Sequence, residues 1–514
     1  MRTTGRKATG RRYWLSCFSL VGVLVLVLVL ALGAFGAGMF RVGMLEPIAL
    51  DPATIEGDAE IAIANAVYDY LVDVSPDNRI VPRLATAWTV SEDGLSYTFT
   101  LAEGVHFHDG SPLVPGDIAW SFDRLRDPEL GFATSSLYAN IDRIDVTGPS
   151  EVTFTLKTTN PFFLFDLSDN RALVLKRGTT DFASFNGTGP FIVVDSGYRP
   201  GERILMRANP DYFVEGQPQL DNLEFIFFKD HGTAVDALRG GQIDMTWRMG
   251  VDLFEGLQGI SGLVTVDVET NAFDLVRFRT DQAPGNDVQV MQALKHATNR
   301  EAILQVVQLG LGATGNDSPV GPMFTELFDP SVEPLAYDPE EARRLLSDAG
   351  YGDGLTLELT APDSGSRRRL AQALKAQWAE VGVDVDLNIV PESVYWSTEG
   401  WLEVNLGITN WGSRPYPQFY LTQMFTCAAL PPDGWNESRF CDEAFDSLVS
   451  IAGSTADPDE LLSTYSQIQR TLADEGPVLI LYFWPQVAAY SDAFSGVELK
   501  AFAGRTDFRT VLEK

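Results

Sequence analysis

Two arginines, Arg277 and Arg279, stand two positions apart in an apolar run of the chain. On an extended strand, residues i and i+2 point to the same face, so both guanidinium groups could bind one carboxylate or phosphate. Asp267, Glu269 and Asp274 lie close by in the sequence and could neutralise both charges instead. The pair is therefore a candidate anion-binding site, with local ion pairing as the alternative.

Aromatic side chains gather in a second candidate segment, at Tyr395, Trp396 and Trp401. Such rings can stack on a sugar or another ring, and their hydroxyl and indole N–H groups can form hydrogen bonds. Filling a hydrophobic core is the commoner fate of tryptophan. The cluster therefore indicates either a ligand-stacking surface or ordinary core.

His106 and His108 alternate along an expected strand and would share one face, as metal ligands can. The chain has only four histidines, and His231 and His296 belong to other segments. The sequence contains no nucleophile elbow, phosphate-binding loop, zinc-protease motif or cysteine array. We therefore expect no metal, no cofactor and no catalytic residue. A hydrolase that uses two carboxylates remains the enzymatic alternative, because acids are abundant.

Strands and hairpins, followed by a short helix, are predicted between residues 79 and 124. Apolar side chains recur at every second position from Trp88 through Phe99 to Phe107, the period of a strand with one buried face. Asp117 is then expected to cap a short amphipathic helix. Two Asp-Gly steps supply the residues that hairpin turns need, Asp93-Gly94 and Asp109-Gly110.

Helices and strands alternate further along the chain. A strand over 355–361, a helix over 366–381 and a strand over 383–390 follow the β-α-β order typical of α/β proteins. Helices are also expected over 288–309 and 339–349. Because about 475 residues exceed what one hydrophobic core usually serves, we expect at least two lobes.

Residues 1–38 have the pattern of an export signal. Five basic residues and no acid precede an uncharged stretch from Tyr13 to Phe40, whose end is rich in glycine and alanine. This stretch is also long enough to span a bilayer, so an uncleaved membrane anchor is the alternative. Cleavage near Ala37 is favoured, because a strand that begins at Met39 would leave an anchored domain no linker.

The formal net charge is -32 at pH 7, from 70 acidic and 38 basic residues. Loss of the five basic residues of the leader would bring it to about -37. So acidic a protein is not attracted electrostatically to nucleic acid or to an anionic membrane surface. Both are therefore excluded as expected partners.

Two cysteines, Cys427 and Cys441, remain after the leader. In an oxidising compartment this short spacing predicts a disulfide, worth about 3 kcal/mol in the chain-entropy model. Two buried free thiols are the alternative.

A series of short segments, from the start of the expected fold to near its end, keeps a fixed order. They are LDP (50–52), PRLATAW (82–88), SEDGLSYTFTL (91–101), GVHFHDG (104–110), GTGPF (187–191), NPDYFVEGQPQLDNLEF (209–225), ALRGGQIDM (237–245), ALKHATNREAI (293–303), PEEARRLLSDAGY (339–351), NWGSRPYP (410–417) and AFDSLVSIA (444–452). Together they resemble the extracytoplasmic solute-binding proteins of peptide-type ABC importers, the dipeptide, oligopeptide and nickel family.

The resemblance implies an α/β, two-lobed periplasmic-binding-protein-like fold with three domains and a ligand cleft at the hinge. The core of lobe I would comprise 39–49, 181–269 and 484–514, with an inserted domain over 50–180. Lobe II would comprise 270–483. The lobes are expected to close on the ligand about the hinge.

The resemblance also implies a site. In peptide binders of this family, an aspartate ahead of a Cys-Ala-Ala motif meets the α-ammonium group of the peptide. Here Cys427-Ala428-Ala429 aligns, and Tyr416 stands at the aspartate position. Losing a charge-assisted hydrogen bond should weaken peptide binding by about 1.5 to 3 kcal/mol. We therefore expect a neutral, aromatic or anionic ligand rather than a free peptide N-terminus.

Arg414, in the same loop, could bind a carboxylate or phosphate, with pairing to a surface acid as the alternative. Trp247 lies where the chain should cross to the second lobe. The expected ligand-binding set is Trp411, Arg414, Tyr416, Trp396, Tyr395, Trp247, Arg277 and Arg279.

The function implied is that of a receptor and not an enzyme. It would capture a small solute or peptide by lobe closure and deliver it to ABC permease subunits driven by cytoplasmic ATPases. We expect a monomer in the periplasm or on the extracellular face of the membrane, attached through the transporter or an uncleaved anchor. The alternatives are a secreted carboxylate-based hydrolase of glycan or peptide and an anchored sensory module.

Overall fold

The computed structural model describes residues 38–514 except 133, 398–399, 433 and 502–503, so nearly all of the expected leader lies outside the described residues. Its centre is an 11-stranded mixed sheet of order β15-β14-β16-β12-β17-β11-β1-β10-β9-β8, with β13 paired to β17. The strands are β1 (Met39–Leu45), β8 (Phe191–Arg199), β9 (Arg203–Ala208), β10 (Asn222–Phe228), β11 (Met245–Trp247), β12 (Leu263–Phe278), β13 (Ala313–Thr314), β14 (Leu355–Pro362), β15 (Val383–Val390), β16 (Leu406–Trp411) and β17 (Val478–Ser491). Within the described residues, no helix is long and apolar enough to cross a membrane.

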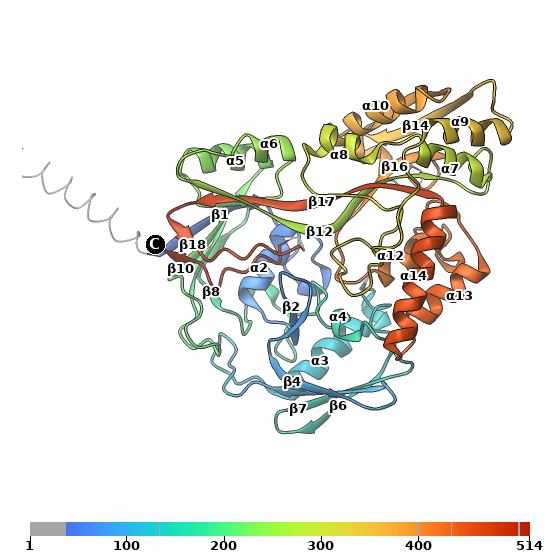
Figure 1. Cartoon of the computed structure of the whole chain (residues 1–514). Helices are drawn as coiled ribbons and strands as arrows, with labels where there is room; N and C mark the ends of the chain where they lie inside the picture. The colour runs from blue at the N-terminus through green and yellow to red at the C-terminus, as the bar shows by residue number, and fades with distance from the viewer. Residues whose placement is uncertain (1–37, 133, 398–399, 433, 502–503) are drawn as a thin grey trace, which may run out of the picture.

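One half of the sheet forms the core of lobe I. β1 pairs in parallel with β10 and β11, and β9 and β8 extend the sheet antiparallel. Side chains at alternate positions of β1, Phe40, Val42 and Met44, enter a large hydrophobic cluster on the face that α2 (Asp58–Val67) covers. Helices α5 (His231–Arg239) and α6 (Val251–Glu255) lie on the other face (Figure 1).

A second sheet, of order β4-β5-β7-β6, forms the outer part of lobe I, at the bottom of Figure 1. Phe99, Phe122 and Phe154 from this sheet and α3 join the same hydrophobic cluster as β1, so the two parts of lobe I share one core. The elements here are β2 (Val72–Val74), β3 (Ile80–Pro82), β4 (Ala85–Val90), β5 (Ser96–Leu101), β6 (Ile141–Gly148), β7 (Glu151–Leu156), α3 (Pro115–Arg126), α4 (Phe163–Asp166), η1 (Pro52–Thr54), η2 (Pro128–Leu130) and η3 (Phe182–Ser184); β18 (Phe494–Ser495) and β19 (Leu512–Glu513) pair near the C-terminus.

Both predicted Asp-Gly turns form, but only the first joins two regular strands. The Asp93-Gly94 step joins the paired strands β4 and β5. The flanks of the Asp109-Gly110 turn are joined by an isolated antiparallel bridge between His106 and Pro112 and by the hydrogen bond from the Leu113 N–H to the Val105 carbonyl at 2.9 Å, so the strand expected there is a single bridge. Asp117 does not occupy the cap position of α3, which begins at Pro115. Its carboxylate instead accepts a hydrogen bond from the Val114 N–H at 2.9 Å, one turn back.

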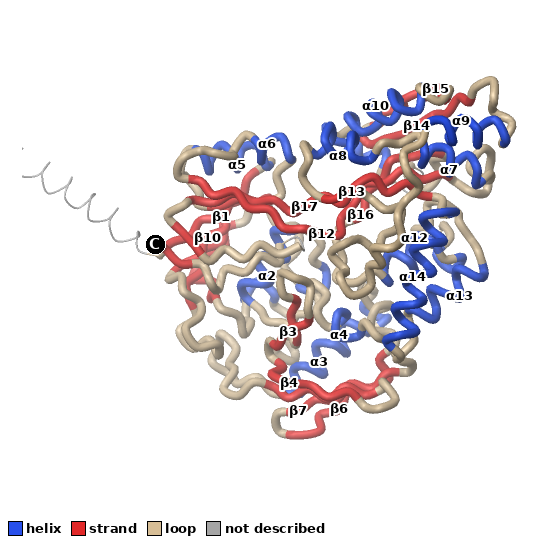
Figure 2. Tube along the Cα trace, viewed as in Figure 1, coloured by secondary structure: helices blue, strands red, loops and turns tan. Residues whose placement is uncertain are grey.

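Lobe II is built on the other half of the sheet, where β14 pairs in parallel with both β15 and β16. Helices α7 (Val288–His296), α8 (Arg300–Gln308), α9 (Pro339–Asp348) and α10 (Gly365–Ala379) cover one face, and α12 (Gln418–Phe425), α13 (Glu443–Ala452) and α14 (Pro458–Glu475) cover the other (Figure 2). The short helices α11 (Glu392–Tyr395) and η4 (Cys427–Ala429) lie in the connections.

The single helix expected over 288–309 is wrong, because two helices form there. α7 ends at His296, and the side chain of Asn299 accepts a hydrogen bond from the Ala302 N–H at 2.9 Å, which starts α8. An asparagine at this position favours a cap over a continuous helix.

The long strands β12 and β17 run through both halves of the sheet and connect the lobes. Their pairing shifts register between Val268 and Ala272, and Asn271 in that interval is fully buried. Asn271 donates to the Pro319 carbonyl at 2.7 Å and accepts from the Gly321 N–H at 3.0 Å. The boundaries expected at 269/270 and 483/484 fall inside these two strands; they and the other domain limits stay predictions.

Candidate interlobe binding site

The parallel strands of each lobe end at a common edge of the sheet, and the loops that leave this edge are the candidates for ligand binding. In lobe II, β14, β15 and β16 run parallel, so the loops that begin at Asp363, Pro391 and Gly412 leave the same edge of the sheet. In lobe I, the parallel strands β1, β10 and β11 likewise end together, and Arg248 follows the last of them. Arg248 has a φ of 54° and forms an ion pair with Asp58. Ligands of α/β proteins usually bind at such carboxyl edges.

Tyr416 reaches from the loop after β16 to lobe I. Its hydroxyl donates a hydrogen bond to Asp166, at the end of α4. Its ring stacks on Phe162, with ring centroids 5.0 Å apart and an interplanar angle of 10°. The Asn78 side chain also donates to the Pro415 carbonyl at 2.9 Å. The two lobes are therefore in direct contact at the loop in which the sequence places the ligand.

Asp166 is buried at this interlobe contact, with 3% of its surface exposed. Its second carboxylate oxygen accepts a hydrogen bond from Asn160 at 2.7 Å. Burial raises the pKa of Asp166 to about 7, although the hydrogen bonds from Tyr416 and Asn160 act in the opposite direction. Sequence reasoning missed Asp166, because no local pattern separates it from the other acids of so acidic a chain.

Trp411 and Arg414 flank the Tyr416 loop. Trp411 is 7% exposed, and its indole N–H donates to Glu437 at 3.3 Å, so it is chiefly a buried support of the loop. The Arg414 guanidinium lies 4.7 Å from the centroid of the Phe419 ring. Among the described residues, no carboxylate lies within 4 Å of this guanidinium, so pairing with a surface acid is not observed.

Comparison with known proteins identifies the family of this chain. Residues 79–430 match the model of the bacterial extracellular solute-binding proteins, family 5. The chain belongs to this family. It is 26% identical over 481 residues to di/tripeptide-binding protein 1 of Pseudomonas aeruginosa (strain UCBPP-PA14), covering 87% of this chain and 88% of that protein. It is 28% identical to the dipeptide-binding protein of Escherichia coli (strain K12), covering 81% and 83%.

Solved structures show the same two-lobed fold. The structure of HbpA2 from Haemophilus parasuis aligns with a TM-score of 0.81 at 24% identity, covering 93% of this chain and 100% of that chain. The expected fold class and family are thus confirmed. The protein is an extracytoplasmic solute-binding protein of the ABC importers that take up peptides or related small solutes.

Arg277 and Arg279 of this solute-binding protein do not form a shared anion site. Arg277 is fully buried, and its Nε donates to Glu437 at 3.0 Å. Arg279 pairs with Asp281 at 2.7 Å and Glu403 at 2.9 Å. Both guanidinium groups therefore form ion pairs within the protein. Their partners are not Asp267, Glu269 or Asp274, the acids that the sequence suggested.

The remaining aromatic candidates separate into core and surface. Trp247 is 2% exposed and packs on Phe508, with ring centroids 6.0 Å apart. Tyr395 is also buried, but Trp396 is 37% exposed and lies 6.1 Å from Trp401. Of these rings, Trp396 is the one that presents a substantial surface to solvent.

The histidine pair lies in lobe I, away from Tyr416. His106 is exposed, whereas His108 is partly buried, with its ring nitrogens 3.2 and 3.0 Å from the carbonyl oxygens of Phe185 and Gly189. Burial lowers the pKa of His108. Both histidines line a hollow of about 670 Å³ together with residues 209–213. In the part of the chain that the structure describes, no three potential metal ligands gather.

Arg367, which sequence reasoning missed, lies in the first turn of α10 at the carboxyl edge of β14. Its guanidinium is 3.6 Å from Asp274 and 3.6 Å from Glu392, and its Nε–H has no hydrogen-bond partner among the described atoms. A loosely paired arginine at this edge could bind an anionic group of a solute. The signal was the run of three arginines, 367–369, at the start of the helix predicted over 366–381.

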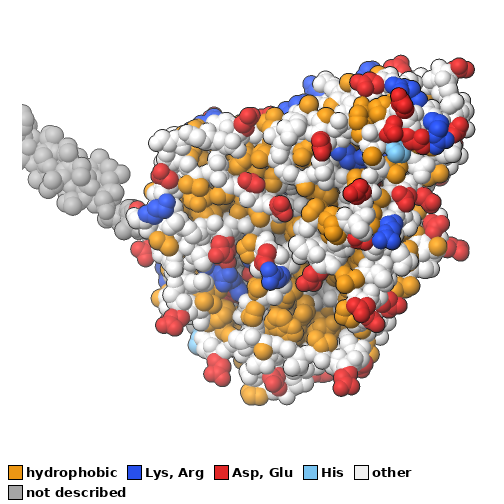
Figure 3. Space-filling model, viewed as in Figure 1, with side chains coloured by type: hydrophobic (Ala, Val, Ile, Leu, Met, Phe, Trp, Pro, Cys, Tyr) orange, Lys and Arg blue, Asp and Glu red, His pale blue; other side chains and the backbone are white. Residues whose placement is uncertain are grey.

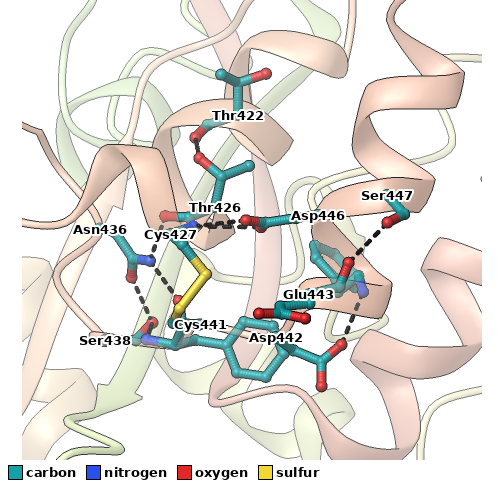
Figure 4. Close-up of a disulfide and its surroundings, with 12 residues drawn as sticks. Thr422, Thr426, Cys427, Asn436, Ser438, Cys441, Asp442, Glu443, Asp446 and Ser447 are labelled. Atoms are coloured by element: carbon teal, nitrogen blue, oxygen red, sulfur yellow. Dashed lines mark hydrogen bonds between the residues drawn. A yellow bond between two sulfur atoms is a disulfide. The ribbon is translucent and has the colours of Figure 1, made fainter.

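The predicted disulfide is confirmed, and Figure 4 shows its surroundings. Cys427 begins η4, and Cys441 lies just before α13, whose N-cap is Asp442. The Cys427 N–H donates to Asp446 of α13 at 3.2 Å. The bridge therefore ties the loop after α12 to the start of α13.

Replacing Cys427 and Cys441 by alanine should lower the free energy of unfolding by about 3 kcal/mol, because the unfolded chain regains the freedom of the closed loop. Urea unfolding of the double variant and the oxidised protein measures this difference. A difference below about 0.5 kcal/mol would contradict a stabilising bridge.

Proposed function

We propose that the solute binds between the lobes at the Tyr416 loop, and that its binding favours their closed arrangement. The observation that carries the proposal is the contact of Tyr416, from lobe II, with Phe162 and Asp166, from lobe I. A solute held there touches both lobes at once, so it stabilises closure by its differential affinity for the closed state. The long strands β12 and β17 are the connections about which the lobes turn.

Short peptides, or small solutes that resemble them, are the proposed class. The relatives named as di/tripeptide- and dipeptide-binding proteins support this class. Arg414 offers a guanidinium beside the Tyr416 loop that has no carboxylate within 4 Å among the described residues, and Trp396 offers an exposed ring. We assign Arg414 to a carboxylate of the solute and Trp396 to stacking.

Arg414→Gln should weaken solute binding about 10- to 100-fold, because it removes a charge-assisted hydrogen bond worth about 1.5 to 3 kcal/mol. Isothermal titration with the solute that co-purifies with the protein measures the change. Arg143→Gln is the matched control, since Arg143 is exposed and lies on β6, far along the chain from this loop. Equal affinity of the Arg414→Gln variant and the wild type would remove Arg414 from the site.

Native mass spectrometry of the gently purified protein tests the function directly. A bound small molecule, released on unfolding and rebound in a 1:1 ratio, is the expected result. Conversion of that molecule on incubation would instead favour the carboxylate-based hydrolase, which membership in a family of binding proteins does not support. We propose that the protein carries no enzymatic activity and that its solute leaves it unchanged.

The proposed partners are the permease subunits of an ABC importer and their cytoplasmic ATPases. We place the monomeric receptor in the periplasm or at the outer face of the membrane. Acidic side chains are spread over the face seen in Figure 3, which accords with the net charge of -32 and with the expectation that no nucleic acid binds. Whether the leader is cleaved would be read from the intact mass of the exported protein.

A further inference from the structure

Asp166 differs from the other buried acids in what compensates its charge. In the described part of the chain, every other buried acid has a basic side chain within 4 Å or accepts hydrogen bonds from backbone N–H groups. The partners are Arg83 for Asp69, Arg505 for Asp73, Arg203 for Glu224, Arg367 for Asp274, Arg300 for Asp317, Arg277 for Glu437, Arg509 for Asp507, and backbone amides for Glu60 and Asp117. Asp166 has only a phenol and a side-chain amide.

An unpaired buried carboxylate costs several kcal/mol, so such groups are rare unless something compensates them. One oxygen of Asp166 is held by Asn160, which belongs to the same lobe. The other oxygen accepts from Tyr416, which belongs to the opposite lobe and leaves when the lobes separate. Opening therefore exposes a carboxylate oxygen whose only partner was a neutral hydroxyl.

Two aromatic rings pack against the Tyr416 side chain that contacts Asp166. Phe162 stacks on Tyr416, and Phe165 lies 6.0 Å from it. A carboxylate with aromatic side chains nearby suits an ammonium group, because the carboxylate pairs with the charge and aromatic rings attract cations. The acidic surface of the protein would also raise the local concentration of cations.

We propose that Asp166 receives an ammonium group of the solute, and that the Tyr416 hydroxyl occupies this carboxylate when the two lobes meet without a solute. This inference rests on the proposed interlobe site and names the chemical class of its ligand, a solute that carries an amine. It also revises the sequence-based expectation that Tyr416 counts against a free peptide N-terminus, because the acid is supplied by the opposite lobe. Tyr416 then acts as a competitor that an amine displaces, since charge-assisted hydrogen bonds are roughly twice as strong as neutral ones.

The groups that face Asp166 set its titration. They are Tyr416 and Asn160, which donate to its carboxylate, Tyr138, which donates to its backbone carbonyl, and the nearby Tyr97 and Asp169. None of these carries a positive charge. Burial raises the pKa of Asp166 to about 7, so amine binding should strengthen as the pH rises through this value.

The test uses the exported protein freed of solute by partial unfolding and refolded with its disulfide intact. The probes are a casein hydrolysate and the same hydrolysate treated with acetic anhydride, which converts its amines to uncharged amides. Thermal shift at pH 8 reports binding. The wild type should be stabilised by the untreated hydrolysate and respond at least 10-fold more weakly to the acetylated one.

Two variants separate the role of the Asp166 carboxylate from that of the Tyr416 hydroxyl. Asp166→Asn should lose at least 10-fold in response to the untreated hydrolysate, whereas Tyr416→Phe, which removes the competing hydroxyl and keeps the ring stack, should respond at least as strongly as the wild type. An equal response to both hydrolysates, no response to the untreated one, or an undiminished response of Asp166→Asn overturns the inference.

Native mass spectrometry tests the receptor function separately from the role of Asp166. If native mass spectrometry releases a bound solute that has no amine, the receptor stands and the role of Asp166 is wrong. If no solute is released and neither hydrolysate binds, the proposed interlobe site and the inference that rests on it both fail.

Discussion

Replacing Asp73 by asparagine is expected to lower the free energy of unfolding by about 3 to 5 kcal/mol, the usual cost of breaking a buried ion pair. Asp73 is 2% exposed and forms an ion pair with Arg505. Lys500 lies 3.3 Å and Arg83 3.7 Å from the same carboxylate. The substitution would leave these buried cations without their shared counterion.

The pKa of Asp73 reflects burial on one side and the three nearby cations on the other. Burial alone would raise it, but Lys500, Arg505 and Arg83 together hold it well below its usual range. Because the folded-state pKa is lowered, the stabilisation is present above the unfolded-state value of 3.8 and is lost as the pH falls below it. The difference between the wild type and Asp73→Asn should therefore be largest near pH 7 and shrink in acid.

Urea unfolding at pH 7 and at pH 3 measures this difference, with Asp77→Asn as the matched control. Asp77 lies four residues along the same chain segment, but it is exposed; it pairs with the exposed Arg79 and accepts a hydrogen bond from the neighbouring Ser75. Its substitution should change little. An Asp73→Asn variant within about 1 kcal/mol of the wild type at pH 7 would mean that the cations are solvated or paired elsewhere.

The overall fold could be predicted because its signals are local. The strand expected over 383–390 is the observed β15, and the helix expected over 339–349 ends one residue earlier, at Asp348. Alternation and caps act over a few residues, so a single sequence carries them. The break between α7 and α8 was missed because a cap by Asn299 outweighed a continuous apolar face.

The site could be predicted only in part, because its contacts join distant segments. The Tyr416 loop was found through its place ahead of the Cys-Ala-Ala motif, but its partner Asp166 lies 250 residues away. The same limit applies to Arg277, whose partner Glu437 lies 160 residues away. In a chain with 70 acids, spacing alone cannot show which acid is buried against which group.

Replacing Asp166 by asparagine is expected to stabilise the solute-free protein at pH 8 by roughly 2 to 4 kcal/mol. The pKa of Asp166 is raised by burial to about 7, against a usual value of 3.8. Because the folded state binds this proton more tightly than the unfolded state, its contribution to stability is greatest below pH 3.8. It is lost progressively as the pH rises through about 7, at roughly 1.4 kcal/mol per pKa unit.

Asparagine fits the same place. Its carbonyl can accept from Asn160, and its amide can donate to the oxygen of Tyr416, so no ionised group remains buried. The stability curves of the two proteins should thus coincide near pH 4 and separate towards pH 8. Tyr416→Phe is the control that keeps the carboxylate: its stability should depend on pH in the same direction as the wild type, with the transition moved to higher pH because the hydrogen bond that lowers the pKa of Asp166 is lost. Parallel curves for wild type and Asp166→Asn would show that Asp166 is not buried in the ionised form.

Whether Asp166→Asn raises or lowers the free energy of unfolding indicates what Asp166 does. A substitution that stabilises the empty protein and weakens its binding of an amine identifies a residue retained at the expense of stability, as polar groups at binding sites often are. A purely structural acid would behave like Asp73, whose loss destabilises the fold. At pH 8, the free energy of unfolding should fall for Asp73→Asn and rise for Asp166→Asn. This opposite sign distinguishes a carboxylate that stabilises lobe I from one that binds a ligand.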